Sequence, residues 1–209
     1  MLGKFVVFEG GECVGKTTQI RLLAEALTKK GYAAVVTKEP GGGGDEALKI
    51  REKLLKGGLS QKEEIDLFIK SRKIHVDNLV RPELQRGSIV LCDRFSDSTF
   101  AYQCYGRNLG VEYAQMQDAA ARGGIAPDLV IVFDMPVEKA LARLEHRKEA
   151  KGEVSAFDLE EKSFHERIRG GFLALAKAFA RNHVVVEADR PVPDVAAEVE
   201  RIVSARLGL

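Results

Sequence analysis

Residues Gly10 to Thr17 read GGECVGKT, which matches the spacing G-x-x-x-x-G-K-[ST]. In such loops, glycines let the backbone N–H groups turn towards one phosphate, the lysine reaches the outer phosphate oxygens, and the hydroxyl ligates Mg²⁺. The alternative, a glycine-rich turn with an incidental lysine, is disfavoured because an apolar run precedes the loop and a helical pattern follows it. We therefore expect Lys16 to be a catalytic cation and Thr17 a metal ligand. The residues expected to bind ATP are Gly10, Gly11, Glu12, Cys13, Val14, Gly15, Lys16, Thr17 and Thr18.

Asp93 and Arg94 directly follow a second apolar run, Ser88–Cys92. Doubly wound sheets bind ligands at the carboxyl ends of their strands, so this pair should lie beside the phosphate loop. An aspartate there can hold Mg²⁺ through water, and an arginine can form two parallel hydrogen bonds to a second phosphate. Taken alone, the pair is equally compatible with a salt bridge at a strand end. Beside a phosphate loop, the binding of a metal and a second phosphate is the favoured interpretation.

Short apolar runs alternate with segments of helical period, which is typical of a parallel sheet wrapped by helices. The five expected strands are Phe5–Glu9, Ala33–Lys38, Ser88–Cys92, Leu129–Asp134 and Val184–Glu187. An apolar stripe from Ile20 to Leu27 indicates a helix that stops at Gly31. The pattern predicts an α/β fold with a doubly wound, five-stranded parallel sheet and helices on both faces. No linker-like segment is visible, so we expect one domain over residues 1–209. The polar segment Lys148–Ser155 is expected to be a mobile loop within a lid segment at about 148–158.

Charge and composition exclude several classes of protein. The chain has 209 residues, with 32 Lys+Arg against 31 Asp+Glu, so no large field of one sign favours a nucleic acid polymer or a membrane surface. The apolar run near the start is too short for a secretory signal, and no run could span a bilayer, so we expect a cytoplasmic protein. The three cysteines, Cys13, Cys92 and Cys104, and the four histidines lack the spacing of a disulfide framework or a zinc site.

Five motifs occur in an order that resembles the thymidylate kinase family. They are Phe8-Glu9-Gly10 before the phosphate loop, Lys38-Glu39-Pro40-Gly41-Gly42, Leu67–Arg72, Asp93-Arg94-Phe95 with Ser98 and Ala101-Tyr102-Gln103, and Asp134–Glu138. The resemblance implies a P-loop NTPase fold of the nucleotide-kinase type. It also implies transfer of the ATP γ-phosphoryl group to dTMP, giving dTDP and ADP for dTTP biosynthesis, with Mg²⁺ as cofactor and a homodimer as the assembly. No N-K-x-D motif follows a strand, which disfavours a GTPase.

The resemblance implies roles for individual residues. The Phe68 position stacks on thymine, the Arg72 position hydrogen-bonds its O4 edge, and the Tyr102 position lies under the sugar. The Arg94 position binds the acceptor phosphate as a catalytic cation, and the carboxylate at Glu12 reaches towards the acceptor. The full substrate-binding set is Glu12, Lys38, Pro40, Phe68, Arg72, Arg94, Ser98, Thr99, Tyr102 and Gln103, and the metal ligands are Thr17 and Asp93. The alternatives are that Phe68 and Tyr102 are core aromatics and that Arg72 is an exposed helix charge.

Arg143 and Arg147 are four residues apart, so they share one helix face leading towards the lid segment. They match the lid-helix arginines of the family and complete the expected catalytic set of Lys16, Arg94, Glu12, Arg143 and Arg147. The alternative is a solvated basic face balanced by neighbouring carboxylates.

The sequence departs from the family pattern in the lid, in the loop and beside two motifs. Ala156 stands where many bacterial relatives carry a lid arginine. Without that cation either turnover is slow or another residue replaces it, for which the candidates are Arg143, Arg147, Lys148 and Lys151. We expect an active enzyme with an atypical arrangement of lid cations. Cys13 replaces a small loop residue, and a thiol at a helix N-terminus is expected to have a lowered pKa and to be oxidisable, which would block ATP binding. Cys104 and Lys38 replace a glycine and an arginine, and Lys38 keeps the charge without the bidentate fork.

Three functions remain open at this point. They are a thymidylate kinase, a related kinase with another acceptor, and a nucleotide-binding switch protein or catalytically degraded homologue.

Overall fold

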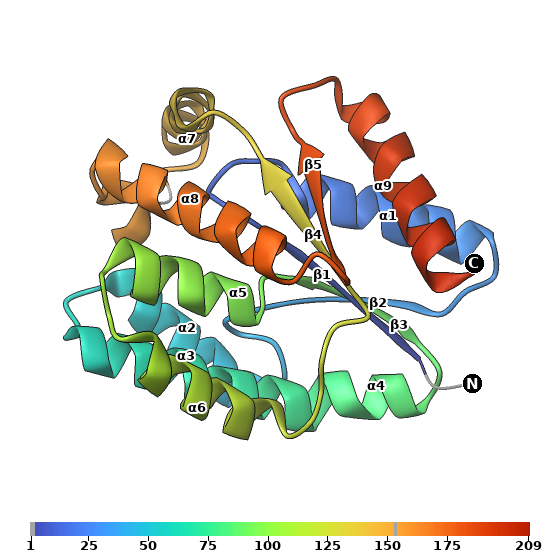
Figure 1. Ribbon diagram of the computed structural model, residues 1–209, viewed down its shortest axis with the longest axis horizontal. Coiled ribbons are helices and arrows are strands. Elements are labelled where there is room, and N and C mark those ends of the chain that lie inside the picture. Colours follow the sequence, from blue (N-terminus) through green and yellow to red (C-terminus); the bar gives the residue numbers. More distant parts are fainter. Residues whose placement is uncertain (1–2, 153) are drawn as a thin grey trace.

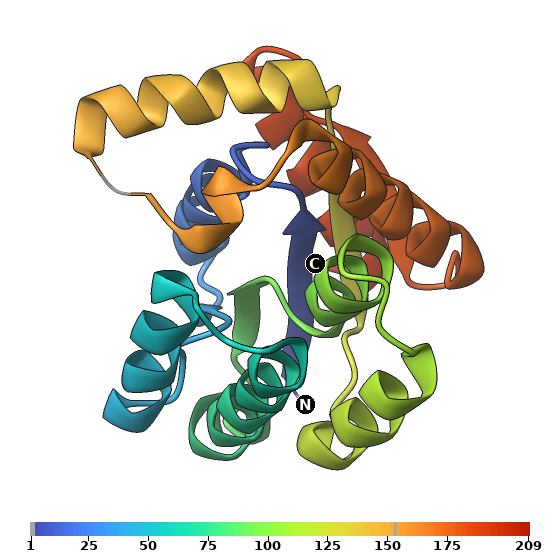
Figure 2. The same cartoon turned by 90° about the vertical axis from the view of Figure 1, so that its left-hand side faces the viewer.

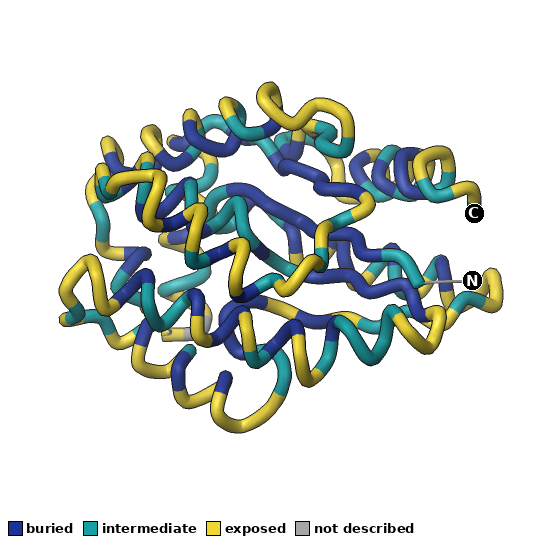
Figure 3. Tube along the Cα trace, turned by 60° about the horizontal axis from the view of Figure 1, so that its bottom comes forward, coloured by how far each residue is buried: buried dark blue, intermediate teal, exposed yellow. Residues whose placement is uncertain are grey.

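The computed structural model describes residues 3–152 and 154–209. Five strands form one parallel sheet in the order β2-β3-β1-β4-β5. The strands are β1 (Lys4–Gly10), β2 (Ala34–Lys38), β3 (Ile89–Asp93), β4 (Leu129–Asp134) and β5 (His183–Glu187). All five lie within one residue of the ranges expected from the apolar runs, which confirms the predicted sheet. Of these strands, the three central ones, β1, β3 and β4, are mostly buried, whereas the edge strands β2 and β5 are mostly intermediate or exposed. In Figure 3 the buried residues accordingly gather in the interior of the molecule.

Helices cover both faces of the sheet (Figure 1). On one face, α1 (Lys16–Lys29) and α9 (Val192–Leu207) enclose a core that includes Phe8, Leu23 and Val199. The other face is covered by η1 (Val76–Val80), α4 (Arg81–Gln85), α5 (Ser96–Thr99), η2 (Phe100–Gly106) and α8 (Lys162–Ala178). The predicted doubly wound architecture is therefore confirmed, because each face of the sheet buries its own apolar cluster.

The remaining helices stand around the carboxyl ends of the strands. They are α2 (Asp45–Lys56), α3 (Gln61–His75), α6 (Val111–Arg122), α7 (Val137–Lys151) and the short 3-10 helix η3 (Ala156–Leu159). In Figure 2, α2 and α7 lie on opposite sides of the end of β1. No helix in the described ranges has the length and apolar character needed to cross a bilayer.

The expectation of a loop at Lys148–Ser155 is partly wrong, because its first four residues are helical. Helix α7 continues through Lys151, because neither glycine nor proline interrupts it and Lys148 pairs with Glu145 at 2.8 Å. It ends at Gly152, whose φ of 66° is the left-handed conformation that glycine adopts easily. Ala156–Leu159 then form η3, so only a short connection separates the two helices. Residue 153 and the side chain of Lys151 lie outside the described part.

Candidate active site

A cavity of about 1860 Å³ opens at the carboxyl ends of the strands. Its wall is formed by the loop after β1, the ends of β2 and β3, helices α2, α3 and α7, and the segment leading into η3. Most residues singled out from the sequence contribute to this wall. They are Glu12, Cys13, Val14, Gly15, Lys16, Thr17, Thr18, Lys38, Pro40, Phe68, Asp93, Arg94, Ser98, Tyr102, Arg143 and Arg147. The structure therefore brings together residues that are up to 135 positions apart in the sequence.

The loop between β1 and α1 curls around the ammonium group of Lys16. Gly10 and Gly15 adopt φ values of 135° and 96°, which their missing Cβ atoms allow. The Lys16 Nζ donates to the carbonyl oxygens of Gly10 at 3.1 Å and Gly11 at 2.7 Å. Burial lowers the pKa of Lys16, and the nearby charge of Arg94 lowers it further. The ammonium group is thus held at the start of α1, where backbone N–H groups favour anions.

Arg94 lies opposite the loop and is held by four acceptors. Its guanidinium donates to the carbonyl oxygens of Gly10 at 2.9 Å and Gly11 at 3.4 Å, to Ser98 Oγ at 3.1 Å, and to the Glu12 carboxylate at 2.8 Å. Glu12 also accepts from the Tyr102 hydroxyl at 2.7 Å. Burial alone would raise the pKa of Glu12, but the charges of Arg94 and Lys16 lower it to about 2. Glu12 is therefore ionised at neutral pH and fixes both Arg94 and Tyr102.

Thr17 and Asp93 meet at the first turn of α1. The Thr17 hydroxyl donates to Asp93 Oδ2 at 2.8 Å. A hydroxyl and a carboxylate oxygen are hard ligands of the kind that Mg²⁺ uses, together with phosphate oxygens and water. The donor set of this pair therefore fits the magnesium ion expected from the sequence.

The base-recognition residues divide into two layers. Phe68 and Tyr102 line the cavity, and both rings pack against Phe157 of η3, with centroid distances of 6.2 and 5.5 Å. Arg72, Thr99 and Gln103 lie behind this wall, and their exposed fractions are 1%, 1% and 0%. The expectation that these three residues form the surface of the pocket is therefore not met in this arrangement, because neighbouring polar groups cover them.

Arg72 is the centre of a buried charge network. It donates to Glu39 at 2.9 Å, to Asp118 at 2.6 Å and to Thr99 Oγ1 at 3.1 Å. Gln103 belongs to a separate buried pair and donates to Glu64 at 2.8 Å. Burial of an arginine costs free energy unless carboxylates compensate its charge, as Glu39 and Asp118 do here. Because the exposed fraction of Arg72 is only 1%, the alternative that it is an exposed helix charge is excluded.

Arg51 is a candidate site residue that the motif search missed. It lies on α2, lines the cavity and donates to the carbonyl oxygen of Pro40 at 2.9 Å. Burial and the charge of Arg94 both lower its pKa. The helical period of the sequence does indicate that Arg51 faces inward, because it shares one face of α2 with the buried residues Ala47, Ile50 and Leu54.

The two α7 arginines line the cavity, as their spacing predicted. Arg143 lies 3.7 Å from Asp189, and Arg147 donates to Asp158 at 2.7 Å. The Nε of Arg147 and Oδ1 of Asp158 are buried without a hydrogen-bond partner among the described residues. The partly buried Arg147 disfavours the solvated-face alternative, whereas the Arg143 side chain lines the cavity but is 44% exposed, so that alternative stays open for Arg143.

Ala156 packs beside the residue that follows α2 and is not among the residues that line the cavity. A Cβ atom built on Gly57, at the end of α2, would lie 2.7 Å from the Ala156 Cβ. The first residue of η3 thus packs against α2, and a longer side chain at this position would meet the backbone there before it could turn into the cavity.

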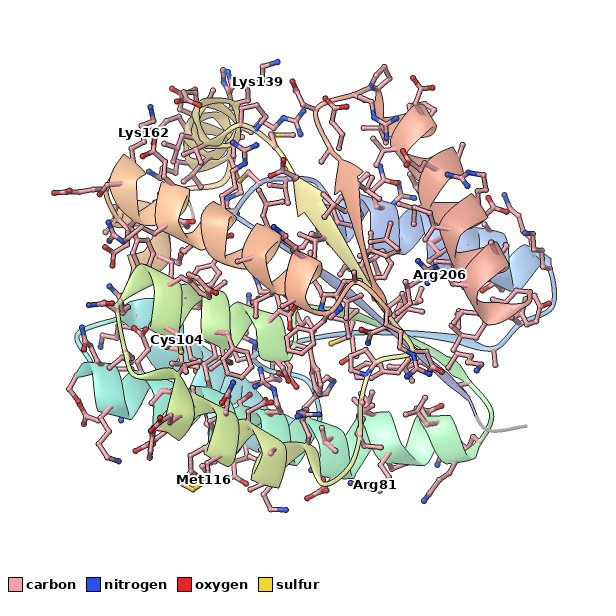
Figure 4. All side chains as sticks on the ribbon, in the orientation of Figure 1. Arg81, Cys104, Met116, Lys139, Lys162 and Arg206 are labelled. Atoms are coloured by element: carbon pink, nitrogen blue, oxygen red, sulfur yellow. The ribbon has the colours of Figure 1, made fainter. Side chains whose placement is uncertain are left out.

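The cysteines differ from expectation in one respect. Burial raises the pKa of the Cys13 thiol, and Arg147 only partly offsets this, so the expected lowering at the helix N-terminus is wrong. Cys13 has a φ of 55°, which places it in the left-handed region that favours glycine. Cys104, labelled in Figure 4, lies on η2 with its pKa also raised by burial.

Comparison with known proteins gives a consistent picture. The thymidylate kinase family model matches residues 8–199. A thymidylate kinase of Desulfovibrio desulfuricans is 42% identical over 211 residues, which cover 97% of this chain and 96% of that protein. Thymidylate kinases of Caulobacter vibrioides and Thermomicrobium roseum are 40% and 44% identical, with 99% and 93% of this chain and 99% and 90% of the relatives covered.

Proposed function

The chain belongs to the thymidylate kinase family, and from this premise we propose that it transfers the γ-phosphoryl group of ATP to dTMP. The products are dTDP and ADP, and the reaction serves dTTP biosynthesis. The family membership confirms the resemblance identified in the sequence motifs.

One observation carries this proposal. Lys16 lies at the start of α1 and Arg94 directly follows β3, yet both donate to the carbonyl oxygen of Gly10. Two cations that meet at one point suit a pair of phosphate groups that must approach each other against their mutual repulsion. A site that binds one nucleotide requires only Lys16.

The chemistry needs no protein nucleophile, because the acceptor phosphate is itself anionic and attacks the γ-phosphorus in line. The protein must align the two nucleotides and neutralise the negative charge that gathers between them. We assign Lys16 to the donor phosphates and Arg94, with Arg51 beside it, to the acceptor phosphate. Arg143 and Arg147 approach from α7 and supply positive charge from the opposite wall.

Thr17 and Asp93 are the residues that would hold Mg²⁺. When bound, the ion neutralises the terminal phosphate oxygens of the donor. Replacing Asp93 with Asn tests this assignment, and we expect the Mg²⁺ concentration for half-maximal rate to rise while the KM for dTMP changes little. An unchanged magnesium requirement would contradict it.

For the acceptor base, Phe68 supplies a stacking face and Tyr102 lies under the sugar. Arg72, Thr99 and Gln103 act from the layer behind, where Arg72 reaches the base once a side chain of the wall moves. In this proposal the chain is one domain with a short lid, the segment from the end of α7 to η3, and it forms a homodimer in solution, which analytical ultracentrifugation tests.

The activity is tested by incubating the purified protein with Mg·ATP and a panel of nucleoside monophosphates and by following ADP. Rapid turnover with dTMP alone supports the proposal. Preference for another monophosphate would indicate a related nucleotide kinase. ADP formation that is absent, or independent of the acceptor, would indicate a nucleotide-binding protein of another kind.

A further inference from the structure

Glu9 is a buried carboxyl group that the proposed reaction does not use. It is the residue before Gly10 at the end of β1, and its exposed fraction is 0%. Its side chain does not enter the phosphate loop. It extends instead to the turn that connects β3 with α5, the same turn that carries Arg94.

Glu9 binds this turn at three points. Its Oε1 accepts from the backbone N–H groups of Phe95 at 2.8 Å and Ser98 at 3.2 Å. Its Oε2 is 2.6 Å from Ser98 Oγ. Since the Ser98 hydroxyl also accepts from Arg94 Nη1 at 3.1 Å, a continuous chain of hydrogen bonds joins Glu9 to the guanidinium of Arg94.

The turn requires such support because its backbone is strained. Arg94 has a φ of 73°, in the left-handed region that is unfavourable for a residue other than glycine. Such a conformation persists only where surrounding contacts fix it. The contacts of Glu9 lie on the residues immediately after Arg94, so they fix the direction in which the arginine side chain leaves the strand.

The charges around Glu9 do not account for its burial as an ion. Asp97 on α5 faces it and is paired with His183 at 2.8 Å, and Arg94 is directed to Glu12 and the loop carbonyls. Burial, and then the charge of Asp97, raise the pKa of Glu9 to about 8. This shift acts against the hydrogen bonds from Ser98 and Phe95 and the charge of Arg94, which lower the pKa. In the observed geometry, Oε1 accepts from two backbone N–H groups and Oε2 accepts from the Ser98 hydroxyl.

We propose that Glu9 is a positioning residue, which holds the strained turn so that the Arg94 guanidinium meets the phosphate of the acceptor. The inference rests on the proposed function of Arg94 as the acceptor-phosphate ligand. It goes beyond that function because it assigns the accuracy of phosphate binding to a residue that touches neither nucleotide.

A purely structural role would also make Glu9 variants less stable, so the test must isolate phosphate binding. Thymidine and dTMP share the base and sugar and differ only in the phosphate. The ratio of their dissociation constants, Kd(thymidine)/Kd(dTMP), therefore reports what the phosphate contributes, and a general loss of stability leaves it unchanged. Calorimetric titration of the full chain measures both constants.

The variants are Glu9→Met, which removes the polar group at similar length, and Glu9→Gln, which keeps one acceptor and one donor. Asp128→Leu is the matched control, because Asp128 accepts from the backbone N–H of Phe5 at 2.8 Å at the opposite end of β1. We expect Glu9→Met to lower the ratio at least about tenfold, and Glu9→Gln and Asp128→Leu to keep it within about threefold.

A folded Glu9→Met variant with the wild-type ratio would overturn this inference while leaving the proposed function intact. A wild-type ratio near one would overturn the role of Arg94, and this inference with it. Should Glu9→Met fail to fold, Glu9→Asp gives the same test, because its carboxyl group is one methylene too short to reach Ser98. A folded Glu9→Asp variant with the wild-type ratio would equally overturn the inference.

Discussion

Lys16 and Arg94 donate hydrogen bonds to the same atom, the carbonyl oxygen of Gly10, at 3.1 and 2.9 Å. Two like charges so close together repel each other, and Arg94 accordingly contributes, after burial, to the lowered pKa of Lys16. Glu12 offsets part of this repulsion through its 2.8 Å contact with Arg94. Phosphate groups placed between the two cations would remove the rest, so the arrangement favours a ligand with phosphates on both sides.

Replacing Arg94 with Lys keeps the positive charge but removes the fork that can hold two phosphate oxygens. We expect kcat/KM for dTMP to fall about 100-fold, while the KM for ATP stays within about threefold. Steady-state kinetics with each substrate varied in turn measures this. Arg206→Lys is the control, because Arg206 lies on α9, where it donates to the carbonyl oxygen of Arg181 (Figure 4). Equal losses for both substrates would contradict the assignment of Arg94 to the acceptor.

Introducing an arginine at Ala156 tests the arrangement of the lid. Because the Ala156 Cβ faces Gly57, we expect the kcat of Ala156→Arg to be unchanged or lower. Removing the cation that does line the cavity, in Arg147→Met, should lower kcat by about 100-fold or more. Lys162→Met, an exposed α8 residue paired with Glu138, serves as the control for charge loss. A tenfold gain in kcat for Ala156→Arg would show that the lid lacks a cation and that Arg147 does not replace it.

Cys13 is expected to react slowly, because burial raises the pKa of its thiol. The measurement is alkylation by iodoacetamide at several pH values in a variant that carries Ser at positions 92 and 104, followed by mass spectrometry. We expect slower modification than for a small free thiol at every pH below 9. Rapid alkylation at pH 6 would contradict this expectation and would show that Cys13 has the lowered pKa predicted from the sequence, as redox control requires.

Glu9 should make the stability of the fold depend on pH. Its pKa is raised from 4.5 to about 8 in the folded chain, so between these values the folded state holds a proton that the unfolded state has released. The free energy of unfolding contributed by Glu9 is therefore complete below pH 4.5 and is lost as pH rises towards 8, with a slope of at most about 1.4 kcal/mol per pH unit.

Urea unfolding of the wild type and of Glu9→Gln at pH 5, 6.5 and 8 isolates this contribution, because all other titrating groups are common to both. The difference in unfolding free energy should shift in favour of Glu9→Gln as pH rises. A difference that stays constant with pH would show that Glu9 is already ionised in the folded protein.

The sheet could be predicted from the sequence because burial on both faces imposes an uninterrupted apolar run on the central strands β1, β3 and β4, and the edge strands β2 and β5 are short β-rich runs as well. The phosphate loop and the Asp93-Arg94 pair could be located for a related reason, since the ends of parallel strands meet at one edge. Arg72 could not be placed in this way. Its surroundings depend on Glu39 and Asp118, which are 33 and 46 residues away, and nothing in the sequence indicates that these carboxylates pair with Arg72.

The pKa of Cys13 shows the same limit. The expected lowering considered only the helix N-terminus, whereas the folded loop buries the thiol, and burial of a group that must ionise raises its pKa. The start of the loop at Lys148–Ser155 was predicted too early because a polar helix without an apolar period, such as the end of α7, resembles a loop in sequence.

Transfer of label from [γ-³²P]ATP to dTMP tests the central claim most directly. With Mg²⁺ present, we expect the label to appear in dTDP at a rate that equals ADP formation, and Arg94→Lys to slow both equally. Labelled inorganic phosphate in place of labelled dTDP, or transfer to another monophosphate in preference to dTMP, would contradict the account.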